Sequence, residues 1–349
     1  MVEIWYAILS FMLVMFLVLE GFDFGAGMLQ FVVGKTEAER RLVIAAIGPL
    51  WSWHEVWLVG FGATLLVAFP AIFTASFAGF YLALFLLLWC LILRGVSIEV
   101  SGHIADPMWR AAWHFIFVVS NILLAILIGA ALGNVLRGVP LEANGKFALA
   151  FFSNFSPYGR VGILDWYTVS VAVFILVTLA AHGANGLVQK TSGPVHDRSL
   201  RLAVTLWKIV AALLVVITVE SWQVRPEMFH GMIHQPFGWL GLAGIFGGLV
   251  FVFTGLQGNR EFLAVLGSSA FIAGLMIAGA AGVFPVMLRS TIAPENSLSA
   301  FQAAAAGNGL TAALIWWPVA SILAVTYMVF IYRHYRGKVE PEQDAQQPY

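Results

Sequence analysis

The stretch LEGFDFGAGML, residues 19–29, decides the fold because it places the carboxylates of Glu20 and Asp23 inside a long apolar segment. A carboxylate at the centre of a membrane helix costs on the order of 3 kcal/mol even on lenient insertion scales, and it usually faces protein or water. The two residues are three positions apart, so they share one face of a helix. This segment predicts a membrane protein with a proton, ion or redox function rather than a soluble enzyme.

A second apolar stretch, WSWHEVWL at residues 51–58, adds further polar groups. Two consecutive spans run in opposite directions, and we expect Glu20 and Glu55 to lie at similar depth on adjacent helices. Three carboxylates and an imidazole near mid-membrane favour a proton path, and the alternative is a purely structural polar network. The predicted path consists of Glu20, Asp23, Ser52, His54 and Glu55.

The composition is that of an integral membrane protein. Hydrophobic residues make up 60% of the 349 residues and charged residues 10%, whereas soluble domains have roughly half and a quarter. A span needs about 20 mostly apolar residues, and the apolar segments of this length predict an all-α bundle of membrane helices. We expect one membrane domain over residues 1–336 and a disordered cytoplasmic tail over 337–349. The formal net charge of zero, without a basic stripe, argues against nucleic-acid binding. The nine predicted spans are 4–32, 44–69, 77–97, 114–136, 163–183, 203–221, 237–256, 262–284 and 312–332.

The distribution of Lys and Arg predicts the orientation, because cytoplasmic loops of membrane proteins carry an excess of both. With nine spans, twelve cations lie on one side and five on the other, so the N-terminus is predicted outside and the C-terminus in the cytoplasm. The cytoplasmic set is Lys35, Arg40, Arg41, Arg94, Arg110, Lys190, Arg198, Arg201, Arg260, Arg333, Arg336 and Lys338. The outside set is Arg137, Lys146, Arg160, Arg225 and Arg289.

Five more residues carry weaker signals. Trp53 and Trp57 are four apart and form an aromatic stripe that could contact a quinone or a lipid, although such stripes more often belong to the core or the interfacial belt. Arg94 and His182 end predicted spans, and Glu99 follows Arg94 by five residues. We interpret these three as structural polar anchors at the cytoplasmic face.

Cofactor motifs are not found in the sequence. The single cysteine, Cys90, excludes an intramolecular disulfide, a thiolate iron–sulfur site and a c-type haem attachment motif. No pair of histidines has a spacing that by itself makes a bis-imidazole haem site. The residues alone therefore predict no metal site, and they leave a single histidine ligand to haem open. The residues alone leave a proton-coupled transporter open as well.

Several motifs resemble subunit II of cytochrome bd-type oxidases, in the expected order along nearly the whole chain. They are GFDFGAGML (21–29), ERR (39–41), GPLW and EVWL within 48–58, LRGVSIE (93–99), GNVLRGVPL (133–141), NFSPYG (154–159), HGAN (182–185), QKTSG (189–193) and FP (284–285). In this resemblance Asp23 matches the acidic residue of GFDxG, Glu55 and Trp57 match the ExW of the second helix, and Arg94 and Glu99 match an R…E pair.

The resemblance implies a multi-pass subunit of a respiratory oxidoreductase in a prokaryotic inner membrane. Such a complex oxidises quinol and reduces O2 to water, and subunit II supports a similar-sized, haem-bearing subunit I. The b- and d-type haems are then expected in that partner, which implies no haem and no catalytic residue in this chain. Subunit II contributes to a proton path that faces the cytoplasm. The resemblance is also compatible with a bound quinone, lipid contacts and small single-span accessory subunits.

One motif departs from the family pattern. Family members commonly have W-D-G-N-E where this chain has Trp51 to Glu55, so Ser52 replaces an aspartate and His54 replaces an amide. A serine cannot hold a proton charge, whereas imidazole titrates near neutral pH. His54 or Glu55 could therefore take over the titrating role. The departure also allows a divergent bd-like oxidase with an electron donor other than quinol.

Overall fold

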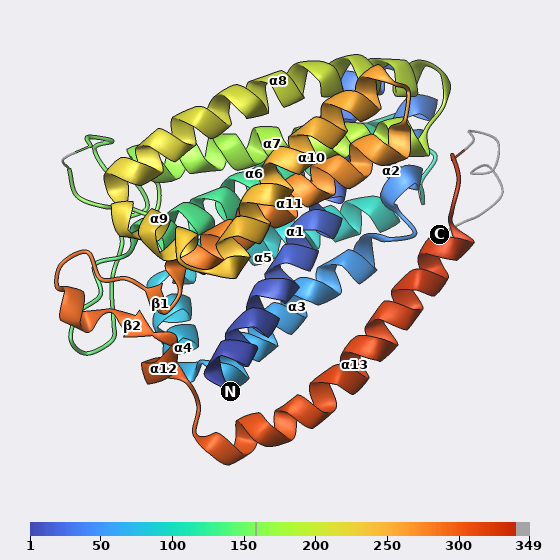
Figure 1. Ribbon diagram of the computed structural model, residues 1–349. Helices are drawn as coiled ribbons and strands as arrows, with labels where there is room; N and C mark the ends of the chain where they lie inside the picture. Colours follow the sequence, from blue (N-terminus) through green and yellow to red (C-terminus); the bar gives the residue numbers. More distant parts are fainter. Residues whose placement is uncertain (158, 340–349) are drawn as a thin grey trace.

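The computed structural model describes residues 1–157 and 159–339, and this part of the chain is almost entirely helical (Figure 1). The long helices are α1 (Val2–Val33), α3 (Trp51–Ala68), α5 (Tyr81–Val100), α6 (Pro107–Arg137), α7 (Trp166–Lys190), α8 (Gly193–Val224), α10 (Pro236–Gln257), α11 (Glu261–Val283) and α13 (Gly307–His334). The shorter elements are α2 (Glu37–Ile47), α4 (Pro70–Gly79), α9 (Pro226–Ile233), α12 (Ala300–Ala303), a 3-10 turn η1 (Pro294–Asn296), and strands β1 (Val286–Leu288) and β2 (Leu298–Ser299).

The predicted membrane architecture is confirmed. Among the described residues, eight helices are long and apolar enough to cross a membrane, and the bent pair α2–α3 makes a ninth. The axis bends by 47° between the two helices of this pair, and the sequence at the bend contains Gly48-Pro49. Proline lacks the N–H that a continuous helix needs and clashes with the preceding turn. The second span, expected as one helix over 44–69, is therefore broken just before the polar stretch WSWHEVWL.

Helix α1 lies inside the bundle, where it packs against α3, α6, α7 and α11 (Figure 1). Small residues allow this: Gly25 of α1 lies directly against the backbone of Gly183 in α7, leaving no space for a Cβ atom on either. Helix contacts in a membrane depend on such close packing because lipid is as apolar as the side chains. The result is that Glu20 and Asp23 of α1 are completely buried.

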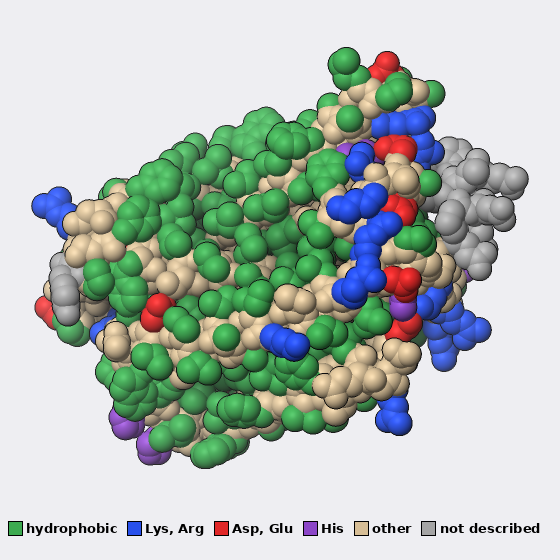
Figure 2. Space-filling view, turned by 90° about the horizontal axis from the view of Figure 1, so that it is seen from above, with side chains coloured by type: hydrophobic (Ala, Val, Ile, Leu, Met, Phe, Trp, Pro, Cys, Tyr) green, Lys and Arg blue, Asp and Glu red, His purple; other side chains and the backbone are tan. Residues whose placement is uncertain are grey.

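Charged side chains gather mainly at one end of the bundle, and the face seen in Figure 2 is otherwise largely hydrophobic. At that end the Arg198 guanidinium binds Glu39 with an Nη2–Oε1 distance of 2.8 Å, and Lys338 Nζ lies 2.8 Å from Glu261 Oε1. At the opposite end, Arg137 at the end of α6 pairs with buried Asp165. The middle of the bundle is left apolar apart from the buried groups described below.

Helix α13 runs along the side of the bundle (Figure 1), and Leu310 is the buried residue among its described side chains. It contacts α3 through Tyr327, whose ring lies 3.8 Å from that of Trp53, and through Tyr332. Beyond it, the Val339 N–H donates to the Lys190 carbonyl at 2.7 Å. The tail predicted to be disordered, 337–349, lies outside the described residues from position 340 onward.

Candidate functional site

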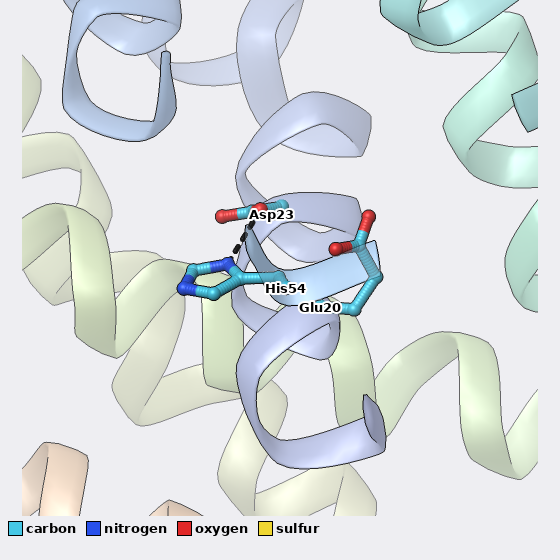
Figure 3. Close-up of side chains that lie close together, drawn as sticks. All are labelled: Glu20, Asp23 and His54. Atoms are coloured by element: carbon cyan, nitrogen blue, oxygen red, sulfur yellow. Dashed lines mark hydrogen bonds and ion pairs between the residues drawn. The ribbon is translucent and has the colours of Figure 1, made fainter. Parts of the chain in front are cut away.

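A buried cluster of charged side chains lies where α1, α3 and α5 meet. Glu20 and Asp23 project from α1, and His54 reaches them from α3 (Figure 3). The His54 Nδ1 is 2.8 Å from Asp23 Oδ2, and all three side chains are fully buried. The break between α2 and α3 places His54 in the first turn of α3, at the level of Asp23. The sequence-based expectation that the two polar stretches meet is thus realised.

Arg94 of α5 links the carboxylates of the cluster. Its guanidinium forms an ion pair with Glu20, lies 2.9 Å from Glu55 Oε1 through Nη1, and lies 3.4 Å from Asp23 Oδ2 through Nη2. Arg94 is itself fully buried, whereas the Glu55 side chain is 25% exposed. A planar guanidinium with five donors suits such a shared position better than an ammonium would.

The cluster holds more acidic groups than fixed positive charge. Glu20, Asp23 and Glu55 would carry three negative charges when ionised, against the single charge of Arg94. Burying uncompensated charge costs several kcal/mol per ion, so the arrangement favours retaining protons on the cluster. Neither oxygen of Glu20 accepts a well-oriented hydrogen bond from a described residue, although Oε1 lies within ion-pair distance of Arg94. Such a site can take up and release protons.

Tyr332 completes the cluster, and sequence reasoning missed it. Its hydroxyl lies 2.8 Å from His54 Nε2. The Asp23 carboxylate accepts a hydrogen bond from His54 Nδ1–H, and the tyrosine hydroxyl, which can donate or accept, is the partner of Nε2. The only signal in the sequence would have been a tyrosine in the last span at the depth of His54, and tyrosines are common near the ends of membrane helices.

Three of the cluster residues have the donor atoms of a cation site. One atom from each of Glu20, Asp23 and His54 lies within 4.8 Å of the others. The Arg94 guanidinium, however, contacts both carboxylates and already supplies positive charge at this point. This geometry favours charge pairing with Arg94 over a bound metal.

Two other predicted residues lie outside the cluster. Ser52 is exposed, and no hydrogen bond connects it to the cluster among the described residues. Glu99 is also exposed and has no described contact with Arg94, because five residues along a helix place the two side chains on different faces. Arg94 is not an interfacial anchor but the centre of the buried cluster.

The remaining predicted residues contact groups of their own chain. The Trp53 ring stacks against Tyr327, and the Trp57 ring meets Phe11 edge-on at 5.7 Å. Buried His182 donates from Nε2 to the Val18 carbonyl at 2.9 Å and contacts Ser268 through Nδ1. His182 therefore joins α7 to α1 and α11.

The buried histidines do not fit the role of haem ligands. In His54, His114 and His182 both ring nitrogens lie within hydrogen-bonding distance of protein groups. A haem iron would need one of these nitrogens free.

The comparisons with known proteins agree with one another. The family model for “Cytochrome bd terminal oxidase subunit II” matches residues 1–335. The “Probable cytochrome oxidase subunit 2” of Haemophilus influenzae is 30% identical and aligns with 97% of this chain and 94% of its own length. The “Cytochrome bd-I ubiquinol oxidase subunit 2” of Escherichia coli K12 is 31% identical over 67% of this chain and 62% of that protein. The structure of bd oxidase from Geobacillus thermodenitrificans shares the fold, with a TM-score of 0.75, 16% identity, and coverage of 96% of this chain and 98% of that chain.

Proposed function

The chain belongs to the family of cytochrome bd terminal oxidase subunit II, and from this premise we propose that it supports a haem-bearing subunit I and forms part of a proton path. It is a multi-pass protein of the bacterial inner membrane and a subunit of an oxidoreductase complex of respiratory electron transport. The complex oxidises a quinol and reduces O2 to water. The b- and d-type haems lie in subunit I, which the hydrogen-bonded state of the buried histidines in this chain supports.

The observation that carries the proton path is the excess of buried carboxylates around Arg94. Glu20, Asp23 and Glu55 exchange protons, and the His54 imidazole takes the titrating role that Ser52 cannot fill. Among the carboxylates of the cluster, Glu55 is the one with an exposed edge, so it gives the cluster one connection to its surroundings. The charge count along the sequence supports proton uptake from the cytoplasmic side, with the N-terminus outside.

The test is purification of the complex from its native membrane through a tag on this chain. We expect a similar-sized partner, b- and d-type bands in the reduced-minus-oxidised spectrum, and quinol-dependent oxygen uptake. A haem-bearing complex that reduces oxygen with another donor but not with quinol would favour a divergent bd-like oxidase. A colourless protein without a partner would overturn the proposal and favour a proton-coupled transporter.

A further inference from the structure

The polar face of α1 continues beyond the carboxylate cluster. Glu20, Asp23, Gly27 and Gln30 follow one another at spacings of three, four and three residues, which places them on a single face of the helix. Gln30 is fully buried, like the two carboxylates. The face therefore leads from the cluster toward the end of α1, where the chain turns into α2.

Helix α6 presents matching polar residues to this face. His114 and Asn121 are seven residues apart, so they lie on one side of α6. The Asn121 amide fills the space beside Gly27 that a Cβ atom would need. The Gln30 amide nitrogen donates to His114 Nδ1 at 3.0 Å. We call the line formed by Asp23, Gly27, Gln30, Asn121 and His114 the α1–α6 seam.

Buried acceptor oxygens without a hydrogen-bond partner lie along this seam and at its inner end. Among the described residues they are Gln30 Oε1, Asn121 Oδ1, Asp23 Oδ1 and both oxygens of Glu20. Each belongs to a side chain that is fully buried. Buried acceptors are nearly always bonded to protein or to ordered water. These acceptors lie in succession between α1 and α6, where bridging water would satisfy them.

The outer end of the seam reaches an accessible carboxylate. His114 Nε2 donates to Glu37 Oε1 at 3.2 Å. The His114 side chain is 1% exposed, whereas that of Glu37 is 36% exposed. The imidazole therefore lies between the accessible Glu37 and the buried Gln30.

We propose that the α1–α6 seam holds a file of hydrogen-bonded water that brings protons from Glu37 and His114 to Asp23 and Glu20. This inference rests on the proposed function and specifies the entry route to its proton-handling cluster. Seven residues of helix separate Gln30 from Asp23, about 10 Å, a distance that roughly three waters in hydrogen-bonded series can bridge. Delivery starts with the His114 hydrogen on Nδ1: Nε2 takes a proton from the Glu37 carboxyl, and Nδ1 releases its hydrogen to the water file once the Gln30 amide turns aside. The ring is then left with hydrogen on Nε2, the tautomer that its contacts with Gln30 and Glu37 describe. Glu37 regains its proton from bulk water, and return of the ring hydrogen to Nδ1 resets the relay.

The test replaces groups of the seam in the whole oxidase complex and measures oxygen uptake at saturating quinol together with proton uptake reported by a pH-indicator dye. We expect His114→Leu and Asn121→Leu to slow both rates on the order of tenfold, equivalent to about 1.4 kcal/mol of barrier. The solvent isotope effect, which is the ratio of each rate in H2O to that in D2O, should also increase. A matched control is His196→Leu, which removes another His–Glu pair (Nε2 to Glu261 Oε1, 2.9 Å) away from the seam. That variant should retain the parental rates and isotope effect.

Haem content and co-purification of the partner show whether each variant assembles. If a leucine variant does not assemble, two milder variants test the two ends of the seam separately. Glu37→Gln lies at an accessible position and should slow proton uptake. Gln30→Glu keeps a polar side chain and should preserve proton uptake. Parental rates in both His114→Leu and Asn121→Leu, combined with a slow Glu20→Gln, would overturn the seam but leave the cluster's role intact. Parental rates in all three would overturn both proposals.

Discussion

Tyr332 and His54 lie 278 positions apart in the chain, yet the tyrosine hydroxyl is 2.8 Å from the imidazole Nε2. This contact joins α13, which is otherwise loosely packed, to the carboxylate cluster in the bundle. The other ring nitrogen, Nδ1, faces the Asp23 carboxylate, so the imidazole is held between the two side chains. The position of the last span and the geometry of the cluster are therefore physically coupled.

Replacing Tyr332 with Phe should loosen α13. The variant loses one hydrogen bond, worth about 0.5–1.5 kcal/mol, and leaves His54 Nε2 without its partner. We expect faster hydrogen exchange over residues 321–334 in nanodisc-embedded complex. Tyr327→Phe is the matched control, since its ring can still stack on Trp53 and its hydroxyl has no hydrogen bond among the described residues. Equal exchange in the two variants would show that the Tyr332 hydroxyl does not hold the helix.

Replacing Arg94 with Leu should prevent assembly. Breaking a buried ion pair by removing one partner costs about 3–5 kcal/mol, because the remaining charges stay buried and uncompensated. The yield of haem-containing complex after purification measures this. The double variant Arg94→Leu with Glu20→Leu should recover part of the yield, since it removes one stranded carboxylate along with the cation. A double variant no better than the single one would mean that Glu20 and Arg94 are not energetically coupled.

Much of the architecture could be predicted from the sequence because long apolar segments have few alternatives in a membrane. The cluster could be predicted in part: Glu20, Asp23, His54 and Glu55 are conspicuous as polar groups in apolar surroundings. Their meeting followed from consecutive spans that run in opposite directions. These inferences depend only on local patterns.

The residues that were misjudged depend on tertiary contacts. Arg94 looks like an interfacial anchor because it lies near the end of an apolar run, but its long side chain reaches Glu20 and Asp23 of α1 and Glu55 of α3, at the centre of the cluster. Ser52 was expected to share the path with Glu55, three residues on, yet its side chain is exposed while Glu55 reaches Arg94. Tyr332 comes from the far end of the chain, and no local pattern relates it to His54.

Replacing Glu55 with Gln should slow oxygen reduction while preserving haem content and assembly. The amide is nearly isosteric and can still accept a hydrogen bond from Arg94 at the position that Glu55 Oε1 occupies, but it cannot carry a proton. General acid–base groups contribute about 10²-fold or more to rates, so a fall of at least that order is expected if the carboxyl is obligatory. Oxygen uptake at saturating quinol is the measurement. Glu99→Gln, an exposed carboxylate on α5, is the control, and normal turnover in Glu55→Gln would remove this residue from the path.

Replacing Gly183 with Ala should separate α1 from α7. A Cβ atom at this position would overlap the backbone of Gly25 and Ala26, and overpacking of a close contact costs about 1–3 kcal/mol. Since α1 carries Glu20 and Asp23, a shift of this helix would also widen the cluster. The fraction of haem-containing complex that survives heating in detergent should fall. Gly279→Ala on α11 is the matched control because no atom lies within 4 Å of its added Cβ, and alanine favours a helix over glycine by up to about 1 kcal/mol. A Gly183→Ala complex as heat-resistant as the Gly279→Ala complex would show that the α1–α7 contact can relax without cost.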